Sequence, residues 1–351
     1  MYAKSFNASP TELVNYLNNE KSSFKSVSLN GGFINANNFN STDLLPSNQN
    51  EVGILDNFKF ISIQNIGITN FDILIDQQGN KYDISNDEIR IENFLIKNGQ
   101  TQFSVTDFKS KINEREVSIR SDVLIKDSIL RFDFENLSYG NSIFTGFVHL
   151  INVNEIKKFK YDGYFTNSTL NSSDFNTPIK DLDIQIESFF EGNIDEIKFK
   201  DLKAKSLENE LITDLFFKFS ESLNDSDIAL ELKSFDSSTT FLYSLFPDLF
   251  GNVIPSAFRN VGKLEMKGIF TKNDDIILSN ADIKTEFGVI DYDIKMSNLK
   301  NINFANYQGS FNGKSFDLAK IINLPFELQS DFNFNINGQG FDEENLKSSV
   351  D

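Results

Sequence analysis

The stretch Gly262-Lys263-Leu264-Glu265-Met266-Lys267-Gly268-Ile269-Phe270 decides the fold class, together with Asp331-Phe332-Asn333-Phe334-Asn335-Ile336-Asn337-Gly338 near the end of the chain. Apolar and polar side chains largely alternate in both. Because successive side chains of a strand point to opposite faces, this alternation is typical of a β-strand with one apolar and one polar face. Neither stretch resembles a catalytic centre, so function has to be inferred from how the pattern recurs.

Strand-like patterns recur from Val27 onward. The clearest predicted strands are Phe58–Ile63, Phe71–Ile75, Glu88–Ile96, Thr101–Phe108, Val117–Ile125, Ile129–Phe134, Ser142–Asn152, Asp181–Phe190, Ile197–Ala204 and Leu211–Phe219. Predicted turns separate several of them, at Gln78-Gly79-Asn80, Lys97-Asn98-Gly99, Tyr139-Gly140-Asn141 and Glu191-Gly192-Asn193. Many strands, short turns and few helices favour an antiparallel meander over a βαβ fold.

A short motif, Lys-Ser-Phe-Asx, occurs three times, at 4–7, 233–236 and 314–317. Each copy ends a predicted strand and precedes a predicted helix, and its Asx is a candidate helix cap. The helices are expected at Ser9–Leu17 (Ser9 as N-cap, Pro10 as first helical residue), at Ser237–Phe246 before Pro247, and at Leu318–Leu324 before Pro325. We interpret the motif as the punctuation of an internal repeat, in which Phe6, Phe235 and Phe316 pack helix against sheet.

The repeats divide the chain into four predicted segments. Residues 1–26 form a short helix and a linker that close a preceding repeat, and residues 27–232 form β-meander repeats. Residues 233–260 form a helical connector, and residues 261–351 form further repeats that are incomplete at the C-terminus.

Composition excludes several function classes. The chain carries 33 basic and 51 acidic residues, a formal net charge of -18, which argues against nucleic acid as a partner and against docking through a basic patch on an anionic membrane. The absence of cysteine excludes disulfides, thiolate catalysis and cysteine-based zinc sites. Phenylalanine reaches 37 residues, which suits contact with an apolar ligand or core.

Candidate catalytic and metal-binding residues are few. His149, the single histidine, is expected to be a structural strand residue. The pairs Asp181/Asp183 and Asp291/Asp293 are expected on a polar strand face, without the spacing of a calcium loop. Gly338-Gln339-Gly340 lacks the context of a dinucleotide fingerprint and is expected to be a turn. We therefore predict a non-enzymatic protein without metal or cofactor.

A membrane-spanning or targeting segment is not predicted. The most apolar long window, Phe241–Phe258, is interrupted by Pro247, Asp248 and Pro255, whereas a spanning helix needs about 20 largely apolar residues. If the protein works outside the cytoplasm, we expect the exporting segment upstream of Met1. Phe241–Phe258 is interpreted either as an amphipathic lid or as an ordinary packed helix.

The block from Phe246-Pro247 through Gly262–Gly268, Thr285–Gly288 and Ser315–Leu318 to Gly338–Asp342 resembles the repeats of the translocation and assembly module family TamB, in its Bacteroidetes form, and the wider AsmA-like superfamily. The likeness is best over residues 230–351. It implies a periplasmic protein, anchored to the inner membrane by a segment outside this chain, of which this sequence is an internal fragment or a truncated reading frame. It further implies a β-groove that conducts phospholipid or assists insertion of outer-membrane proteins.

The apolar face of such a meander can be covered by a second sheet, by barrel closure, or by a ligand that fills a trough. Periodicity alone favours the sandwich or barrel; the repeat and the resemblance favour the trough. We therefore expect an elongated antiparallel β-groove whose partners are phospholipid acyl chains, with an outer-membrane assembly barrel protein as a possible second partner. The residues expected to line it are Leu182, Ile184, Ile186, Leu264, Met266, Phe332, Phe334 and Ile336.

Two other functions stay open at this point. A secreted or surface structural protein would pack its β-layers dry for adhesion or scaffolding. A chaperone would offer an open strand edge to an unfolded outer-membrane protein.

Overall fold

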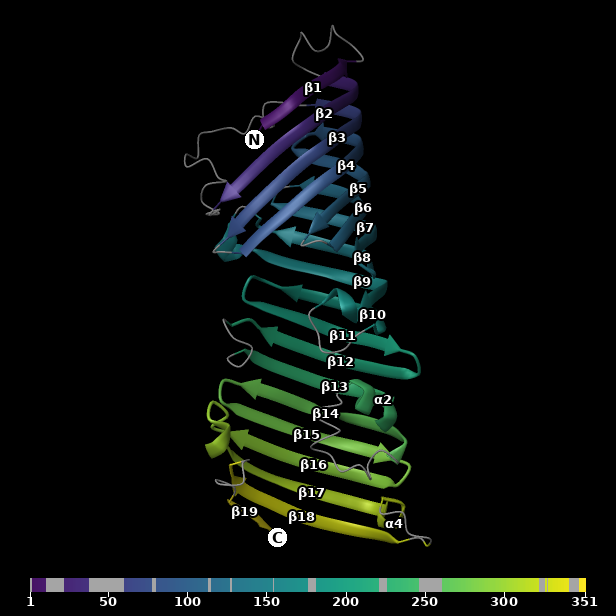
Figure 1. The fold of residues 1–351 in the computed structure, drawn as a ribbon, viewed down its shortest axis with the longest axis vertical. Helices are drawn as coiled ribbons and strands as arrows, with labels where there is room; N and C mark the ends of the chain where they lie inside the picture. The colour runs from purple at the N-terminus through teal and green to yellow at the C-terminus, as the bar shows by residue number, and fades with distance from the viewer. Residues whose placement is uncertain are drawn as a thin grey trace. The chain divides into compact units, whose positions relative to one another are not determined.

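The computed structural model describes residues 2–10, 22–37, 60–77, 80–112, 115–126, 128–153, 155–175, 181–220, 226–245, 261–321, 326, 328–340 and 347–351. The chain divides into two compact units, Met1–Phe175 and Asn176–Asp351. Most of the described residues in both units lie in β-strands (Figure 1).

The described residues of unit 1 form a meander of nine strands with two short 3-10 helices. The strands are β1 (Tyr2–Pro10), β2 (Ser22–Asn37), β3 (Phe60–Gln77), β4 (Asn80–Lys97), β5 (Gln100–Ile112), β6 (Arg115–Lys126), β7 (Ile129–Tyr139), β8 (Ser142–Ile151) and β9 (Lys160–Asn171). The 3-10 helices are η2 (Ile156–Lys158) and η3 (Ser172–Asp174). Successive strands pair antiparallel, except that β2 and β3 are parallel.

The described residues of unit 2 form ten strands with the same meander order. They are β10 (Asp183–Gly192), β11 (Glu196–Ser206), β12 (Asn209–Lys218), β13 (Asp227–Ser238), β14 (Lys263–Asn273), β15 (Ile276–Thr285), β16 (Gly288–Ser297), β17 (Asn306–Asp317), β18 (Gln329–Gln339) and β19 (Lys347–Val350). Each pairs antiparallel with the next. The helices are α2 (Thr239–Leu245), η6 (Ile302–Phe304) and α4 (Leu318–Ile321).

The prediction of a mainly β, antiparallel meander with a few short helices is confirmed for each unit. Local turn chemistry explains why it could be made. Between β4 and β5, Asn98 and Gly99 both have positive φ, 52° and 74°, as a type I′ hairpin turn requires and as Asn-Gly permits. Between β7 and β8, Gly140 has φ 60°, in the predicted turn.

The predicted helix at Ser9–Leu17 does not begin at Ser9. Ser9 and Pro10 are the last residues of β1, where they pair with Ser26 and Phe24 of β2. Backbone pairing outweighs the capping signal here, and a proline is tolerated at a strand end because no ladder hydrogen bond is lost there. Residues 11–17 lie outside the described residues. In addition, the predicted strands Phe58–Ile63 and Phe71–Ile75 belong to one strand, β3.

The other two predicted helices are present but short. Asp317 caps α4 as predicted, because its Oδ1 accepts the Lys320 N–H at 3.4 Å. Asp236 does not cap α2: it lies in β13, and Ser238 Oγ instead accepts the Phe241 N–H at 3.1 Å. Residues 246–260 and 322–325, with Pro247 and Pro325, lie outside the described residues. The predicted segment boundary at 232/233 falls inside β13, whereas the two units meet at 175/176.

Neither unit buries a large dry core within its described residues. The largest of the almost fully buried side chains are small and polar, namely Thr213, Ser142, Ser168, Ser188 and Ser226, and the described apolar residues buried to the same degree are alanines, such as Ala305 and Ala319. The apolar cluster of unit 2 consists of Val261, Phe287 and Phe316, with Ile290 and Phe332 against it. A second sheet that would cover an apolar strand face is not present among the described strands, which pair side by side into a single layer in each unit.

Candidate apolar groove

Register gives unit 2 a continuous apolar face. Residues directly opposite each other in paired strands point to the same side of a sheet. One row across eight pairings contains Ile186, Ala204, Leu211, Phe235, Met266, Ile283, Ile290, Gly313 and Phe332. A second contains Phe190, Phe199, Leu215, Leu230, Phe270, Ser279, Ile294, Gly309 and Ile336. We call the side that carries these rows the inner face of unit 2.

The structure brings most of the predicted lining residues onto this inner face. Ile186, Met266 and Phe332 share the first row, and Ile336 lies in the second. Phe334 stands between the rows, opposite Phe311. The list is completed by Leu264, opposite Ser237 and Thr285; by Ile184, two residues before Ile186 on β10; and by Leu182, which precedes β10. That these side chains contact lipid stays a prediction.

Most inner-face side chains are half-buried rather than enclosed. Met266, Phe334 and Ile336 are of this kind, while Leu264 is 6% exposed. Aromatic rings follow one another across β16, β17 and β18: the ring centroids of Tyr292 and Phe311 are 6.1 Å apart, and those of Phe311 and Phe334 are 4.9 Å apart. These side chains are therefore packed against their neighbours within the sheet, and part of their surface stays exposed.

Phe332 has a second set of contacts that alternation did not reveal. Its ring packs edge-on against Phe316, with centroids 5.8 Å apart and planes at 81°. It also leans over Gly313, where an added Cβ would lie 2.1 Å from the Phe332 ring. An aromatic ring that covers a cross-strand glycine stabilises the strand pair. Phe332 thus belongs to the packed cluster below α4 as well as to the inner face.

The opposite, outer face of unit 2 carries mostly polar side chains, including Asp291 and Asp293 as predicted, together with a few exposed apolar ones such as Ile269, Ile276 and Leu278. Asp291 stands opposite Asp282 and accepts a hydrogen bond from Asn312 Nδ2 at 2.7 Å. A shallow hollow of about 450 Å³ is lined mainly by outer-face residues that include Asp282, Asp291 and Asp293, with contributions from Leu232 and Tyr292. The described residues contain no group of three or more potential ligands arranged to hold a metal ion.

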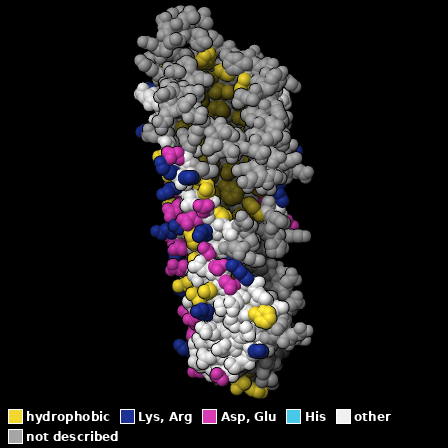
Figure 2. Space-filling view, turned by 90° about the vertical axis from the view of Figure 1, so that its left-hand side faces the viewer, with side chains coloured by type: hydrophobic (Ala, Val, Ile, Leu, Met, Phe, Trp, Pro, Cys, Tyr) yellow, Lys and Arg dark blue, Asp and Glu magenta, His cyan; other side chains and the backbone are white. Residues whose placement is uncertain are grey.

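Unit 1 has a comparable apolar side. One row contains Phe103, Val123, Phe132, Val148 and Gly163. Figure 2 shows hydrophobic side chains gathered inside a hollow that runs along much of unit 1. Each unit thus combines a single sheet layer with an apolar side.

His149 lies in β8, as predicted for a strand residue. Its Nδ1 is 2.8 Å from Oδ1 of Asp162, which stands directly opposite on β9. Arg131 stands opposite His149 on β7 and lies over the Phe147 ring, 5.3 Å from its centroid. These residues alternate with Phe132 and Val148, so His149 belongs to the polar side of unit 1, away from its apolar row.

Sequence reasoning missed a recurring β-bulge. Relative to both neighbouring strands, β13 contains one extra residue at Lys233, because Leu232 pairs with Gly268 whereas Phe235 pairs with Met266. The alternation therefore changes phase, and Leu232 and Phe235 both face inward. The Lys-Ser-Phe-Asp motif marks this bulge as well as the strand end. The sequence does contain a signal for the bulge. Two polar residues, Lys233 and Ser234, stand between the apolar Leu232 and Phe235, where regular alternation would have only one.

The same irregularity recurs in β11 and β17. In β11 the extra residue is at Asp201, with φ 50°, between inward-facing Phe199 and Leu202. In β17 it is at Ser315, with φ 49°, between inward-facing Gly313 and Phe316. A residue with positive φ is a usual way to accommodate an extra residue in a strand.

The straight strand beside each of these bulges carries a matching polar pair. Thr213 Oγ1 donates to the Asp214 carbonyl, and Ser330 Oγ donates to the Asp331 carbonyl, both at 3.0 Å. Asp214 Oδ1 accepts the Asp201 N–H at 2.7 Å, and Asp331 Oδ1 accepts the N–H of Ser315, also at 2.7 Å. The dipeptides Thr213-Asp214 and Ser330-Asp331 thus satisfy the backbone groups that a bulge removes from the ladder.

Charge is concentrated at the β11–β13 bulges. Lys233 Nζ donates to Asp201 Oδ1 at 2.6 Å and to Asp214 Oδ1 at 2.7 Å. These two hydrogen bonds raise the pKa of Lys233 above its usual range. Burial opposes ionisation of Asp214, but hydrogen bonds from Lys233 and from the Asp201 N–H outweigh it and lower the pKa of Asp214.

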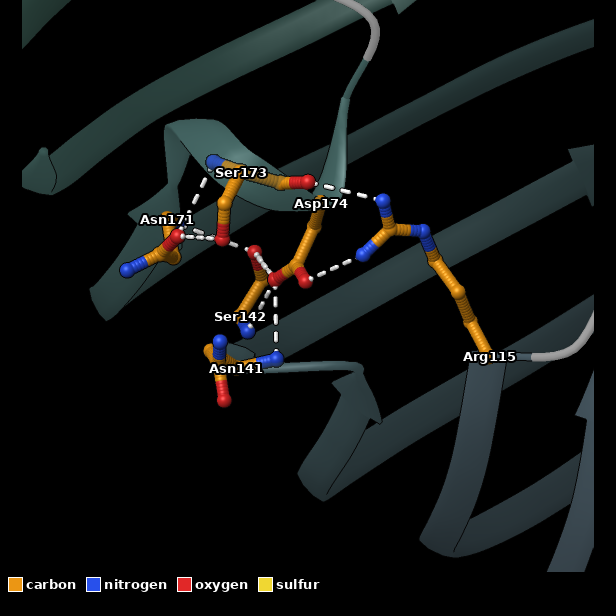
Figure 3. Close-up of polar contacts among 6 residues, drawn as sticks. All are labelled: Arg115, Asn141, Ser142, Asn171, Ser173 and Asp174. Carbon is orange, nitrogen blue, oxygen red and sulfur yellow. Dashed lines mark hydrogen bonds and ion pairs between the residues drawn. The ribbon is translucent and has the colours of Figure 1, made fainter. Parts of the chain in front are cut away.

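A second polar cluster surrounds Asp174 of η3 in unit 1 (Figure 3). Asp174 Oδ2 accepts the N–H groups of Asn141 and Ser142 and the Ser142 hydroxyl, at 2.7–2.8 Å. Arg115 donates to Asp174 Oδ1 at 2.9 Å and to the Ser173 carbonyl at 2.7 Å. The buried carboxylate is therefore fully partnered, and the cluster holds η3 against the β7–β8 turn.

Comparison with family models, with curated proteins and with solved structures finds no match to this chain. The resemblance to TamB repeats therefore stays a prediction. None of the helices in the described part of the chain has the length and apolar character needed to cross a bilayer.

Proposed function

We propose that the chain is a segment of a periplasmic TamB/AsmA-like protein, anchored to the inner membrane outside this chain, whose apolar faces form a groove for phospholipid acyl chains. The groove would carry phospholipid between the inner and outer membranes and so serve outer-membrane biogenesis. No step of this function requires bond chemistry, metal or cofactor.

One observation carries the proposal: the inner face of unit 2 is apolar along many successive strands, and no second sheet covers it among the described residues. Half-exposed apolar side chains in continuous rows need a partner, since large exposed apolar patches are uncommon on soluble proteins. An acyl chain suits such rows, because each buried methylene contributes about 0.8 kcal/mol without requiring a polar contact. Rows of similar side chains allow the ligand to move along them.

The test is the phospholipid that co-purifies with the chain, quantified by mass spectrometry. A carboxylate on the inner face would have to be desolvated by the acyl chain. Met266→Glu and Phe334→Glu should therefore each lower the molar ratio of phospholipid to protein several-fold.

The matched controls lie on the same strands and point to the other face. Ile269 on β14 is 49% exposed, and Asn335 on β18 lies on the outer face. Ile269→Glu and Asn335→Glu should leave the phospholipid ratio unchanged. Equal loss from both faces, or no phospholipid on the unsubstituted chain, would contradict the proposal.

A further inference from the structure

Two extra residues, one on β11 and one on β13, meet across the strand between them. Asp201 in β11 and Lys233 in β13 are the bulge residues, which have no partner position on the neighbouring strands. Lys233 Nζ reaches Asp201 Oδ1 at 2.6 Å over β12, and β12 contributes Asp214 Oδ1 at 2.7 Å. Asp214 also accepts the Asp201 N–H, so all three residues share one hydrogen-bond network on the outer face.

The position of an extra residue decides which side chains face inward. A one-residue change of register moves every later side chain of a strand to the opposite face. In β11 the apolar side chains before Asp201 have odd numbers, Ile197 and Phe199, whereas Leu202 and Ala204 after it have even numbers. Without an extra residue at this place, Lys203 and Lys205 would face inward.

We propose that Lys233, Asp201 and Asp214 form a positioning cluster that fixes the two extra residues and so sets the inward-facing side chains of β11 and β13 beyond them. The three residues lie on the outer face, but their contacts determine which side chains of β11 and β13 point to the inner face. It maintains the surface on which the proposed lipid groove rests, but its effect on side-chain orientation does not depend on lipid.

The geometry distinguishes this cluster from an ordinary surface ion pair. Lys233 bridges two carboxylates on two strands. The side chains of Lys233 and Asp214 are about one third exposed, whereas that of Asp201 is 56% exposed. Lys284 and Glu265 form a single outer-face contact at 3.5 Å between the straight strands β14 and β15, and both are at least half exposed. Exposed pairs of the second kind contribute little to stability or register.

Because the chain contains no cysteine, single cysteines can report side-chain orientation. Ala204→Cys and Lys205→Cys place a thiol on the inner and outer faces of β11, just beyond the bulge. Reaction with a water-soluble maleimide, on delipidated protein, should be about tenfold faster at position 205 than at position 204. Lys233→Met should bring this rate ratio close to one, because the register of β11 is then no longer held.

Two further variants separate positioning from loss of stability. Lys233→Arg keeps a donor for both carboxylates and should keep the rate ratio of the unsubstituted chain. Lys284→Met, the control, should also keep it. If Lys233→Met does not fold by circular dichroism, Asp214→Asn takes its place: it keeps an oxygen for the Asp201 N–H but loses the charge that holds Lys233, and the ratio should fall at least threefold.

An unchanged rate ratio in folded Lys233→Met, or in Asp214→Asn, would overturn the proposal. So would an equal fall in Lys284→Met. Since the labelling uses delipidated protein, a chain that never binds phospholipid would refute the lipid groove and leave this test intact.

Discussion

Lys233 Nζ on β13 lies 2.6 Å from Asp201 Oδ1 on β11, although β12 runs between the two strands. Both residues are the extra residue of a bulge. In β11 and β13 the side-chain alternation changes phase at the bulge, whereas in β12 between them it does not. The contact between the two extra residues explains how the apolar side chains of all three strands can stay on one face. The bulges do not interrupt the repeat; they are part of it.

The pH dependence of stability should reveal the Asp214 contact. The pKa of Asp214 is lower in the folded chain than the ordinary aspartate value of 3.8. Its contribution to stability is therefore present above that value and is lost as pH falls through the folded-state pKa. The difference in unfolding free energy between the unsubstituted chain and Asp214→Asn should therefore be constant near neutral pH and shrink below pH 3.8. Urea unfolding at a series of pH values measures it. A difference that grows on acidification would contradict this assignment.

Asp174→Ala should destabilise unit 1 strongly. The carboxylate is buried and accepts from Arg115, from two backbone N–H groups and from Ser142. Its removal leaves these donors without their acceptor, and each buried donor left unsatisfied costs about 1–3 kcal/mol. Asp133→Ala is the control, because Asp133 pairs with Arg131 at an exposed site and its loss should cost no more than about 1 kcal/mol. Urea unfolding of both variants measures the two losses of unfolding free energy. Similar losses would argue against the conclusion that Asp174 holds η3 against the β7–β8 turn.

Phe316→Ala should open a cavity in the cluster below α4. Phe316 is 2% exposed and packs with Val261, Phe287 and Phe332, and a buried Phe→Ala change costs about 3–5 kcal/mol. Phe304→Ala, at a side chain that is 52% exposed, should change the unfolding free energy by less than about 1 kcal/mol. Thermal unfolding followed by circular dichroism tests both. Equal shifts would mean that Phe316 is not a packed core residue.

Gly146→Ala should disrupt the pairing of β8 with β9. Gly146 has φ 140°, and an added Cβ would lie 1.9 Å from the Tyr164 carbonyl oxygen, so the substitution combines backbone strain with a clash and should cost at least about 2 kcal/mol. Gly67→Ala is matched in chemistry but has open space around it and should stay within about 1 kcal/mol. Hydrogen exchange of the β8 and β9 amides would locate the effect. Unchanged protection in Gly146→Ala would refute it.

The strand content, the antiparallel meander and several turns could be predicted from residue order alone, because side-chain alternation and Asn-Gly turns are local properties of a chain. For the same reason, alternation alone predicted a shared face for seven of the eight lining residues: Ile184, Ile186, Leu264, Met266, Phe332, Phe334 and Ile336. The packing of Phe332 against Phe316 could not be predicted in this way, because it depends on how β17 and β18 pair.

Only tertiary structure decided where alternation changes phase. The motif Lys-Ser-Phe-Asp resembles a strand end because its two polar residues interrupt the alternation of apolar and polar side chains. Whether these residues end the strand or form a bulge within it depends on the neighbouring strand. At 233–236 that neighbour supplies Asp214, and at 314–317 it supplies Asp331. Ser9 and Pro10 differ from prediction for the same physical reason, since backbone pairing with β2 outweighs a local capping preference.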